Sequence, residues 1–396
     1  MIDLSRDGYT HEQVKNVLHM RHGSRQVRFR YFLLDRFDRE IAEITKNMLG
    51  GTIEQNAFSE IKRTAKFRMK DTKYIKDGKE HEINFNTDRI QVFMEIKMPD
   101  EYEQKIVDDE DWYFITPVFG TDGGKILQRT KKEGGWISFS LGIFLLASPT
   151  KQEEGKGVYR EIEAYDKLLI LRDDKVEERF TLAAGGSYYN AMRNLLLGAG
   201  ITKINIENTG KTLPNDKEYD PGTSRLQILN DLASDLNFTQ IWIDEYGYAR
   251  SEQYRSPAEQ APDYEYTDDD LSVMLEGSEE ELDLFDIPNV FTVVVSNPDD
   301  DTILTSTVVN NNPDHPRSVP NLGRRVVRFE EKDDIADQAS LDSYVERLAF
   351  ESSQIFGRVR FRTAIMPFHS YSNVLRIRNK TLGIDDKYSE VSWSIP

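Results

Sequence analysis

Two neighbouring histidines are the first residues whose type and spacing could do chemistry. His19 and His22 are three residues apart, so a helix would place both imidazoles on one face. A zinc site needs further ligands at a known spacing. The HExxH pattern is absent, and no carboxylate accompanies the pair. We interpret the two histidines as solvent-exposed side chains and predict no metal ligands.

A strongly acidic segment is the second candidate. Residues 264–286 contain ten carboxylates and no lysine or arginine. These acids could bind calcium or form a glycosidase pair. A calcium loop of the EF-hand type needs regularly spaced oxygens around a central glycine, and that pattern is missing. Glycosidase carboxylates face each other across a sugar cleft, which spacing along a chain cannot reveal. Solvated loops or salt bridges between subunits are the preferred interpretation, and Asp299–Asp301 is predicted to be a turn. The acids concerned are Asp268, Asp269, Asp270, Glu279, Glu280, Glu281, Asp283 and Asp286.

Patterns for phosphate binding and nucleophilic catalysis are also missing. The glycine pairs Gly50-Gly51, Gly123-Gly124 and Gly185-Gly186 are followed by no lysine-serine and belong to no GxGxxG. No GxSxG nucleophile motif occurs. The absence of cysteine excludes disulfides, thiolate zinc sites and cysteine nucleophiles. We therefore predict no catalytic, cofactor-binding or metal residues, no cofactor and no enzymatic activity.

Rows of like charge are more informative. Arg358, Arg360 and Arg362 alternate with other residues, so they share one face of a predicted strand. Arg28 and Arg30 form a similar row, as do Glu161 and Glu163. Pairing with opposite charges across strands or subunits is the preferred explanation, and contact with DNA is the alternative.

Composition limits the class of protein. The chain has 396 residues, enough for two or three domains. Its net charge of −18 is typical of a soluble surface, or alternatively of a channel wall that repels DNA. A general nucleic-acid binder is disfavoured, since such proteins carry a basic footprint. No apolar run is long enough for a membrane helix, and the N-terminus lacks the apolar core of a secretory signal.

Alternating apolar residues predict strands in the first part of the chain. Residues 1–25 form an extension with a short helix, whose capping box pairs Thr10 with Gln13. Residues 26–175 then form a first β-barrel domain, in which residues 99–135 are long exposed loops or a protruding hairpin. The predicted strands of this domain are 27–33, 61–69, 90–98, 136–147 and 158–164.

Helical patterns follow in residues 176–262, a predicted small α+β domain. Ser187 caps a helix over 188–197 that ends before glycine, and Ser224 caps the next helix. Residues 240–250 are predicted to form a hairpin that turns at Tyr246-Gly247.

The remainder, 263–396, is predicted to be a second β-barrel domain with one helix at about 338–356, capped by Ser340. Its predicted strands are 290–296, 303–309, 325–329, 359–365, 374–378 and 387–395. The predicted fold class is therefore α+β, mainly β, with two barrels that flank the α+β insert.

From about residue 26 onward the sequence resembles the tail hub proteins, or minor tail proteins, of long-tailed bacteriophages. These are similar in fold to the central baseplate hub of contractile-tailed phages. The similar segments, in chain order, are NAFSEIKRTAKF (56–67), GIFLLASPT (142–150), EAYDKLLIL (163–171), PGTSRLQILNDLASDLNF (221–238), EEELDLFDIPN (279–289), VVVSNPD (293–299), NPDHPRSVPNLGRR (312–325) and ERLAFESSQIF (346–356).

This resemblance implies a virion structural protein at the tail tip or baseplate, assembled in the host cytoplasm. Such hubs are homotrimers whose paired tail-tube-like barrels form a pseudo-sixfold ring. One face meets the hexameric tail tube or distal tail ring, and the other meets a threefold central spike or tail fibre. The tape-measure protein ends in or near the lumen, and DNA passes through without specific binding during genome ejection.

Many relatives continue into a hydrolase or spike module, but here the last predicted strand reaches Pro396, so no such module is expected.

Two alternative functions remain open. A cell-wall hydrolase would use the acids of 264–286. A host-receptor-binding tail protein would use the loops at 99–135.

Overall fold

The computed structural model describes most of the chain, in two compact units. Unit 1 comprises residues 1–2, 31–92 and 140–396, and unit 2 comprises residues 3–30 and 93–139. The described residues are 2–21, 23–70, 72–107, 126–154, 157–257, 260–269, 273–282, 287–295, 303–332, 335–354, 357–371 and 373–396. None of the helices in these residues is long and apolar enough to span a membrane.

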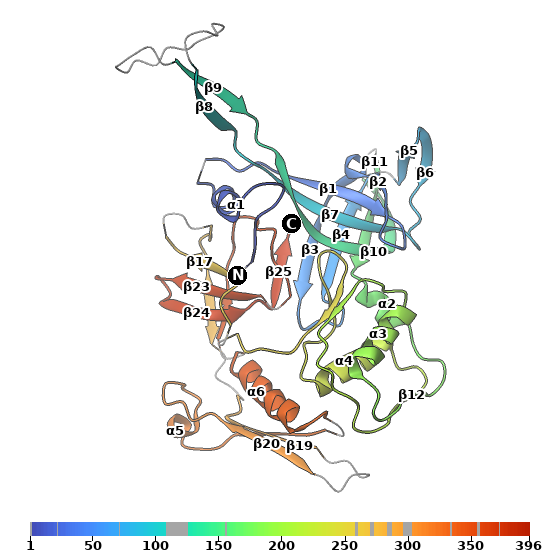
Figure 1. The fold of residues 1–396 in the computed structure, drawn as a ribbon, viewed down its shortest axis with the longest axis vertical. Coiled ribbons are helices and arrows are strands. Elements are labelled where there is room, and N and C mark those ends of the chain that lie inside the picture. Colours follow the sequence, from blue (N-terminus) through green and yellow to red (C-terminus); the bar gives the residue numbers. More distant parts are fainter. Residues whose placement is uncertain are drawn as a thin grey trace. The chain divides into compact units, whose positions relative to one another are not determined.

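An eight-stranded sheet is the largest element (Figure 1), and most of it belongs to unit 1. Its inward residues alternate with outward ones, so β4 buries Ala65, Phe67 and Met69. The Phe67 ring packs edge-on against Tyr31 and Phe144 at centroid distances of 6.1 and 5.6 Å. In strand order the sheet is β2 (Glu40–Glu43), β1 (Val27–Leu34), β7 (Arg89–Lys97), β10 (Trp136–Glu154), β11 (Gly157–Tyr165), β4 (Arg63–Met69), β3 (Met48–Asn56) and β25 (Ser392–Ile395).

The last strand of the chain completes this sheet. β25 pairs antiparallel with β3, with Ile395 opposite Ile53. The prediction of one strand over 387–395 is therefore wrong. β24 (Ile384–Ser389) belongs to a different sheet, with β23 (Val374–Asn379) and β17 (Tyr264–Thr267). The chain changes sheets at Glu390-Val391, where each residue bonds a different segment: Glu390 N–H donates to Asn373 O, and Val391 O accepts from Ala57 N–H.

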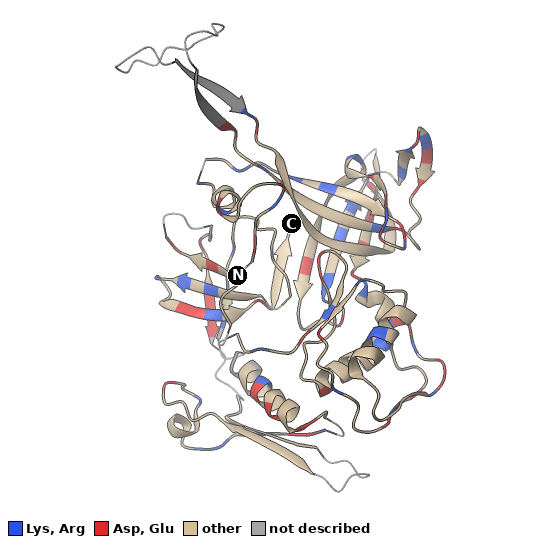
Figure 2. Cartoon of the chain, in the orientation of Figure 1, with Lys and Arg blue, Asp and Glu red and all other residues tan. Residues whose placement is uncertain are grey.

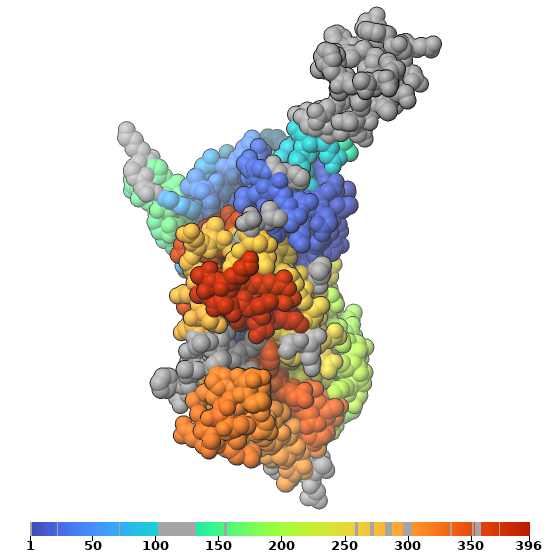
Figure 3. Space-filling model, turned by 90° about the vertical axis from the view of Figure 1, so that its left-hand side faces the viewer, coloured from blue at the N-terminus to red at the C-terminus, as the bar shows by residue number. Residues whose placement is uncertain are grey.

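The second, smaller β sheet is strongly charged. β17 pairs parallel with β23, and their surfaces adjoin in yellow and red in Figure 3. Charged residues of both signs lie side by side on β23 and β24, as Figure 2 shows, with Arg378 opposite Asp385 and Arg376 opposite Lys387. Arg376 Nε lies 2.9 Å from Asp385 Oδ1.

A helical region of unit 1 has its own apolar core, which includes Leu196, Leu229 and Phe238. Both predicted caps are confirmed, since Ser187 and Ser224 accept hydrogen bonds from the third residue that follows. The predicted hairpin is also confirmed, since Gly247 sits in its turn with a φ of 80°. The elements are α2 (Leu168–Asp173), β12 (Phe180–Leu182), α3 (Tyr188–Gly198), β13 (Ile204–Ile206), β14 (Lys217–Tyr219), α4 (Arg225–Asp235), β15 (Trp242–Ile243) and β16 (Ala249–Ser251).

A third apolar core lies between α6 (Gln338–Gln354) and a three-stranded sheet, where Phe291 and Val293 pack on Leu341 and Val345. The prediction that Ser340 caps this helix is wrong. Ser340 lies inside α6, and its N–H donates 2.7 Å to Oδ1 of Asp337, which precedes the helix. The sheet and neighbouring elements are β19 (Val290–Val295), β20 (Leu304–Val309), α5 (Val319–Leu322) and β21 (Val327–Lys332).

Three two-stranded ladders are the remaining strands of the described residues. One short 3-10 helix (Thr45–Asn47) precedes β3. Two of the ladders belong to unit 1: β5 (Lys73–Lys76) with β6 (Lys79–Glu82), and β18 (Glu279–Leu282) with β22 (Gly357–Arg360). The prediction of a mainly β, α+β fold is confirmed. Among the described residues the strand orders form separate open sheets, so the two barrels and the domain bounds stay predictions.

Unit 2 contains the predicted N-terminal helix. α1 (His11–Leu18) begins at Thr10, whose hydroxyl accepts from Gln13 N–H while the Gln13 side chain bonds Thr10 N–H. The capping box is confirmed. β8 (Glu101–Val107) pairs antiparallel with β9 (Ile126–Lys132), as the hairpin alternative for 99–135 predicts. Residues 108–125, with Gly123-Gly124, lie outside the described residues.

Candidate functional site

The histidine pair is brought to no metal site that the structure describes. His19 is the C-cap residue of α1, and His22 lies outside the described residues. Within the described ranges no group of three or more histidine, aspartate or glutamate side chains is placed to hold a metal ion.

The acidic segment and the arginine row, predicted separately, meet on two neighbouring strands. Glu279 and Glu281 of β18 lie opposite Arg360 and Arg358 of β22. Arg360 reaches both acids, with N to O distances of 3.7 Å to Glu279 and 3.4 Å to Glu281. Cross-strand pairing is confirmed, within one chain. Asp270, Asp283, Asp286 and Asp299–Asp301 lie outside the described residues.

The other two charged rows are also paired. In unit 2, Arg28 and Arg30 contact Glu95 over 2.5 and 3.2 Å, and the Glu95 side chain is only 4% exposed. In unit 1, Glu161 and Glu163 of β11 lie opposite Arg68 and Lys66 of β4. The Arg28 and Arg30 row therefore forms ion pairs, and the Glu161 and Glu163 row has cations opposite it in the strand register.

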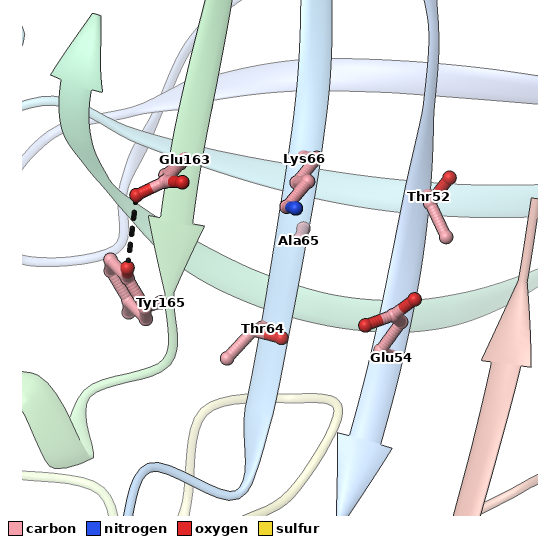
Figure 4. A pocket seen from close by; sticks show the side chains of 7 residues that line it. All are labelled: Thr52, Glu54, Thr64, Ala65, Lys66, Glu163 and Tyr165. Carbon is pink, nitrogen blue, oxygen red and sulfur yellow. Dashed lines mark hydrogen bonds between the residues drawn. The ribbon is translucent and has the colours of Figure 1, made fainter.

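A pocket lies on the outward face of β3, β4 and β11 (Figure 4). Two carboxylates, Glu54 and Glu163, flank it, with Lys66 between them on the middle strand. The Tyr165 hydroxyl donates 3.2 Å to Glu163. The lining combines charged groups with small apolar surfaces, which suits the binding of a side chain that is partly apolar and partly charged. The remaining lining residues are Thr52, Thr64 and Ala65.

Buried charges lie behind this face, where β4 begins. Arg63 is 1% exposed. Its guanidinium donates twice to Oε1 of Gln55, over 3.2 and 3.0 Å, and once to Leu141 O. Its backbone N–H donates 3.0 Å to Asp166 Oδ2. Burial raises the pKa of Asp166 to about 6, against hydrogen bonds from Leu168 and Arg63 that lower it.

Lys62 extends this charged junction to the helical region. Its ammonium donates to Ala57 O, Ser59 O and Gln240 Oε1 over 2.9, 3.3 and 2.9 Å. Burial lowers the pKa of Lys62 to about 8. Because a buried charge is costly unless it is hydrogen-bonded, these contacts restrict how the two regions can move apart.

A second charged junction centres on Asp38, whose side chain is 5% exposed. Arg89 lies 2.5 Å from it, Lys203 lies 3.5 Å from it, and Lys167 also pairs with it. Lys167 donates 3.0 Å to Gly247 O. Burial opposes ionisation, but Lys167 and Arg89 outweigh it and lower the pKa of Asp38.

Sequence reasoning missed both junctions. Lys62 and Arg63 lie in NAFSEIKRTAKF, a segment that resembles tail hubs but contains no pattern that predicts buried charges. A signal was present, since Arg63 occupies an inward position in the β4 alternation.

Comparison with known proteins gives a result at the level of the fold. No family model matches the sequence, and no curated protein sequence matches it. A tail protein from Neisseria meningitidis aligns over 92% of this chain and 91% of its own, with a TM-score of 0.56 and 10% identity. The chain has the fold of phage tail proteins.

Two further tail proteins give the same result. A 43 kDa tail protein of prophage MuSo2 from Shewanella oneidensis has a TM-score of 0.54 at 10% identity, covering 92% of this chain and 93% of that one. The prophage tail protein gp18 from Listeria monocytogenes has a TM-score of 0.52 at 10% identity, covering 92% and 90%. The resemblance to phage tail proteins is thus confirmed in fold, over nearly the whole chain.

Proposed function

We propose that this chain is a structural hub of a phage tail tip or baseplate. The observation that carries the proposal is the shared fold with tail proteins from three bacteria, over 92% of the chain in each case. Alignment over nearly the full length of both chains favours a similar part in the tail over a borrowed single domain.

In this proposal three copies form a ring. Each copy contributes two tail-tube-like barrels, from residues 26–175 and 263–396, with residues 176–262 between them. Six similar barrels then present a pseudo-sixfold face to the tail tube or distal tail ring. The opposite face keeps threefold symmetry for a central spike or tail fibre, and the lumen accommodates the tape-measure protein and passing DNA.

The buried junctions suit a hub. A ring that joins two symmetries must hold its parts at fixed angles, and buried ion pairs are costly to break once formed, by about 3–5 kcal/mol. The ion pair of Lys167 with Asp38, and the hydrogen bond from the Arg63 backbone N–H to Asp166, connect the large sheet to the segment that leads into the helical region. A rigid connection of this kind serves assembly without any catalytic group.

The mass of the purified chain in solution tests the hub. Light scattering is expected to give three times the 45.8 kDa of one chain. Antibody labelling of assembled tails is expected to mark the tip or baseplate. A chain that stays monomeric even with tube or distal tail rings added would overturn the trimer.

Two further assays test the alternatives. For a cell-wall hydrolase, zymography should show clearing that is lost when Glu279, Glu280 and Glu281 are changed to Gln. We expect no clearing, because Glu279 and Glu281 are paired with arginines. For a receptor binder, deletion of residues 102–132 should block adsorption and spare tail assembly. We expect the hub role to survive this deletion.

A further inference from the structure

The turn between β1 and β2 holds an aromatic ring out in solvent. Phe37 is 61% exposed. The guanidinium carbons of Arg36 and Arg39 lie 4.7 and 5.1 Å from its ring centroid. Exposed aromatic and arginine side chains are the residue types enriched at the energetic centres of protein interfaces.

The turn is built to be rigid. Asp35 Oδ1 accepts from the backbone N–H of Phe37 and Arg39, over 2.8 and 3.0 Å, and Oδ2 accepts from Arg39 Nε over 2.8 Å. Asp38 adopts a φ of 61° and is fixed by its ion pairs with Arg89 and Lys167. A ring already held in place loses little conformational entropy on binding.

The Asp38 junction joins this turn to two more exposed aromatic residues. Lys203 pairs with Asp38 and donates 3.0 Å to Tyr246 O. Tyr246 and Tyr248 are 41% and 39% exposed, and the Lys203 ammonium lies 5.7 Å from the Tyr248 ring centroid. We name this surface the Phe37 patch: Arg36, Phe37, Arg39, Lys203, Tyr246 and Tyr248.

The Phe37 patch carries two cations that are each paired with one carboxylate, since Lys203 pairs with the buried side chain of Asp38 and Arg39 pairs with Asp35. Arg36, which is exposed, adds a further cation beside the ring. A matching surface would offer carboxylates around an apolar recess of the size of one ring.

The pocket on β3, β4 and β11 has these properties (Figure 4). Glu54 and Glu163 flank it on either side of Lys66, so its acids outnumber its cations, and Thr52, Thr64, Ala65 and Tyr165 complete the lining. Its cavity volume is about 100 Å³, of the order of the roughly 150 Å³ cavity that accepts a benzene ring. In the strand order the Phe37 turn joins the first two strands, whereas the pocket occupies the fifth to seventh. The two surfaces therefore lie toward opposite edges of one sheet.

We infer that the Phe37 patch of one copy docks in the β3–β4–β11 pocket of a second copy. The contact joins two unlike surfaces head to tail, and such contacts repeat into a ring when the rotation closes. The cations of the Phe37 patch and the two carboxylates of the pocket are locally complementary in charge, which favours a second copy of this chain as the partner. This inference rests on the proposed trimer and names an interface for it.

Two sets of variants test the contact. Phe37→Ala removes the ring, and Glu54→Lys with Glu163→Lys reverses the charge of the pocket. Each is expected to raise the concentration at which half of the chain is assembled by about 30-fold, the effect of losing one central interface residue. Phe329→Ala is the matched control, since Phe329 is 60% exposed on β21 and lies outside both surfaces. Circular dichroism and the melting temperature check that each variant folds.

A mixing experiment separates this contact from other causes. The Phe37→Ala variant keeps an intact pocket, and the pocket variant keeps an intact Phe37 patch. Mixed 1:1 at a concentration where each alone is monomeric, they are expected to form a capped dimer of two chains. A symmetric contact, in which both copies use the same surface, would not require one variant to supply the surface that the other lacks.

The outcomes distinguish the two proposals. A wild-type trimer that neither variant weakens, or a mixture that stays monomeric, overturns the docking contact and leaves the hub. A wild type that stays monomeric even with tube or distal tail rings added overturns the trimer itself. DNA binding that Phe37→Ala abolishes, with the assembly state unchanged, would assign the Phe37 patch to nucleic acid and overturn the inference.

Discussion

Asp166 Oδ2 accepts a hydrogen bond from the backbone N–H of Arg63 over 3.0 Å, and the two residues are 103 positions apart. Both are almost fully buried, at 2% and 1% exposed. Asp166 Oδ1 accepts a second bond from Leu168 N–H over 2.8 Å. One carboxylate thus holds the start of β4 against the start of α2.

Asp166→Asn is expected to lower the free energy of unfolding at pH 7 by about 1–3 kcal/mol. An amide has one acceptor oxygen, so one of the two N–H groups is left facing an NH2 group, and a buried unpaired group costs that much. Urea unfolding measures the loss. Asp174→Asn, which breaks a partly exposed pair with Arg225, is the control and is expected to cost less than about 1 kcal/mol.

The pH dependence of the same variant is a second measurement. The pKa of Asp166 is about 6 in the folded chain, above the ordinary value of 3.8, so the folded state binds more protons between these values. The proton-linked part of its contribution to stability is fully present below pH 3.8 and is lost as pH rises through 6, whereas the two accepted hydrogen bonds remain at pH 7. The wild-type advantage over Asp166→Asn should shrink over that range, and a constant gap would refute this assignment.

Glycine 51 is predicted to be required on steric grounds. A Cβ there would lie 2.6 Å from Lys66 O and 2.8 Å from Phe67 Cδ1 on the paired strand. Gly51→Ala is expected to cost about 1–3 kcal/mol, the usual penalty of overpacking, measured by thermal or urea unfolding. In Gly198→Ala the nearest atom is the movable end of Arg225, so this helical control should be neutral or stabilising.

Most helix starts could be predicted from residues close together in the sequence, whereas other elements depend on contacts between distant segments. Thr10, Ser187 and Ser224 cap as predicted, because a cap depends on residues three positions apart. Ser340 is not the cap of α6, because the Asp337 side chain, three residues earlier, accepts the capping hydrogen bond from the Ser340 backbone N–H.

Some elements depend on partners that a sequence pattern cannot show. β3 was not predicted, because Gly50, Gly51 and Glu54 break the apolar alternation, and its pairing with β4 and β25 forms it. The junctions were missed because Lys62 and Arg63 are usually exposed residue types. Their acceptors come from distant segments.

Glu95 is predicted to hold the strands of unit 2 together. It receives hydrogen bonds from Arg28, Arg30 and the Ser138 hydroxyl, over 2.6, 3.2 and 2.9 Å. Glu95→Gln keeps the shape and removes the charge, so it should lower the local stability by about 1–3 kcal/mol, as for hydrogen bonds to charged groups. Hydrogen exchange of the amides in residues 27–30 and 93–97 measures the loss.

Acid should have the same effect on the wild type. Burial opposes ionisation of Glu95, but the hydrogen bonds from Arg28, Ser138 and Arg30 outweigh it, so its pKa lies below the ordinary value of 4.5. Its stabilising contribution is present above pH 4.5 and is lost as pH falls through the lowered pKa. Equal acid sensitivity of wild type and Glu95→Gln in these amides would contradict the role given to Glu95.

The link between β24 and β25 is predicted to depend on His369. Its Nδ1 pairs with Glu390 Oε1, and Asn373 Nδ2 donates 3.0 Å to the other oxygen of Glu390. The Glu390 side chain is 5% exposed, so losing its partner leaves a nearly buried carboxylate under-satisfied. His369→Ala is expected to cost about 1–3 kcal/mol.

The loss should be concentrated where β25 joins the large sheet, because Glu390 directly precedes that strand. Hydrogen exchange is expected to rise in residues 390–395 and in their partners on β3. His369→Gln, which retains a side-chain donor, should recover part of the protection. If exchange rises evenly over the whole chain in His369→Ala, the residue supports general stability and does not specifically secure β25.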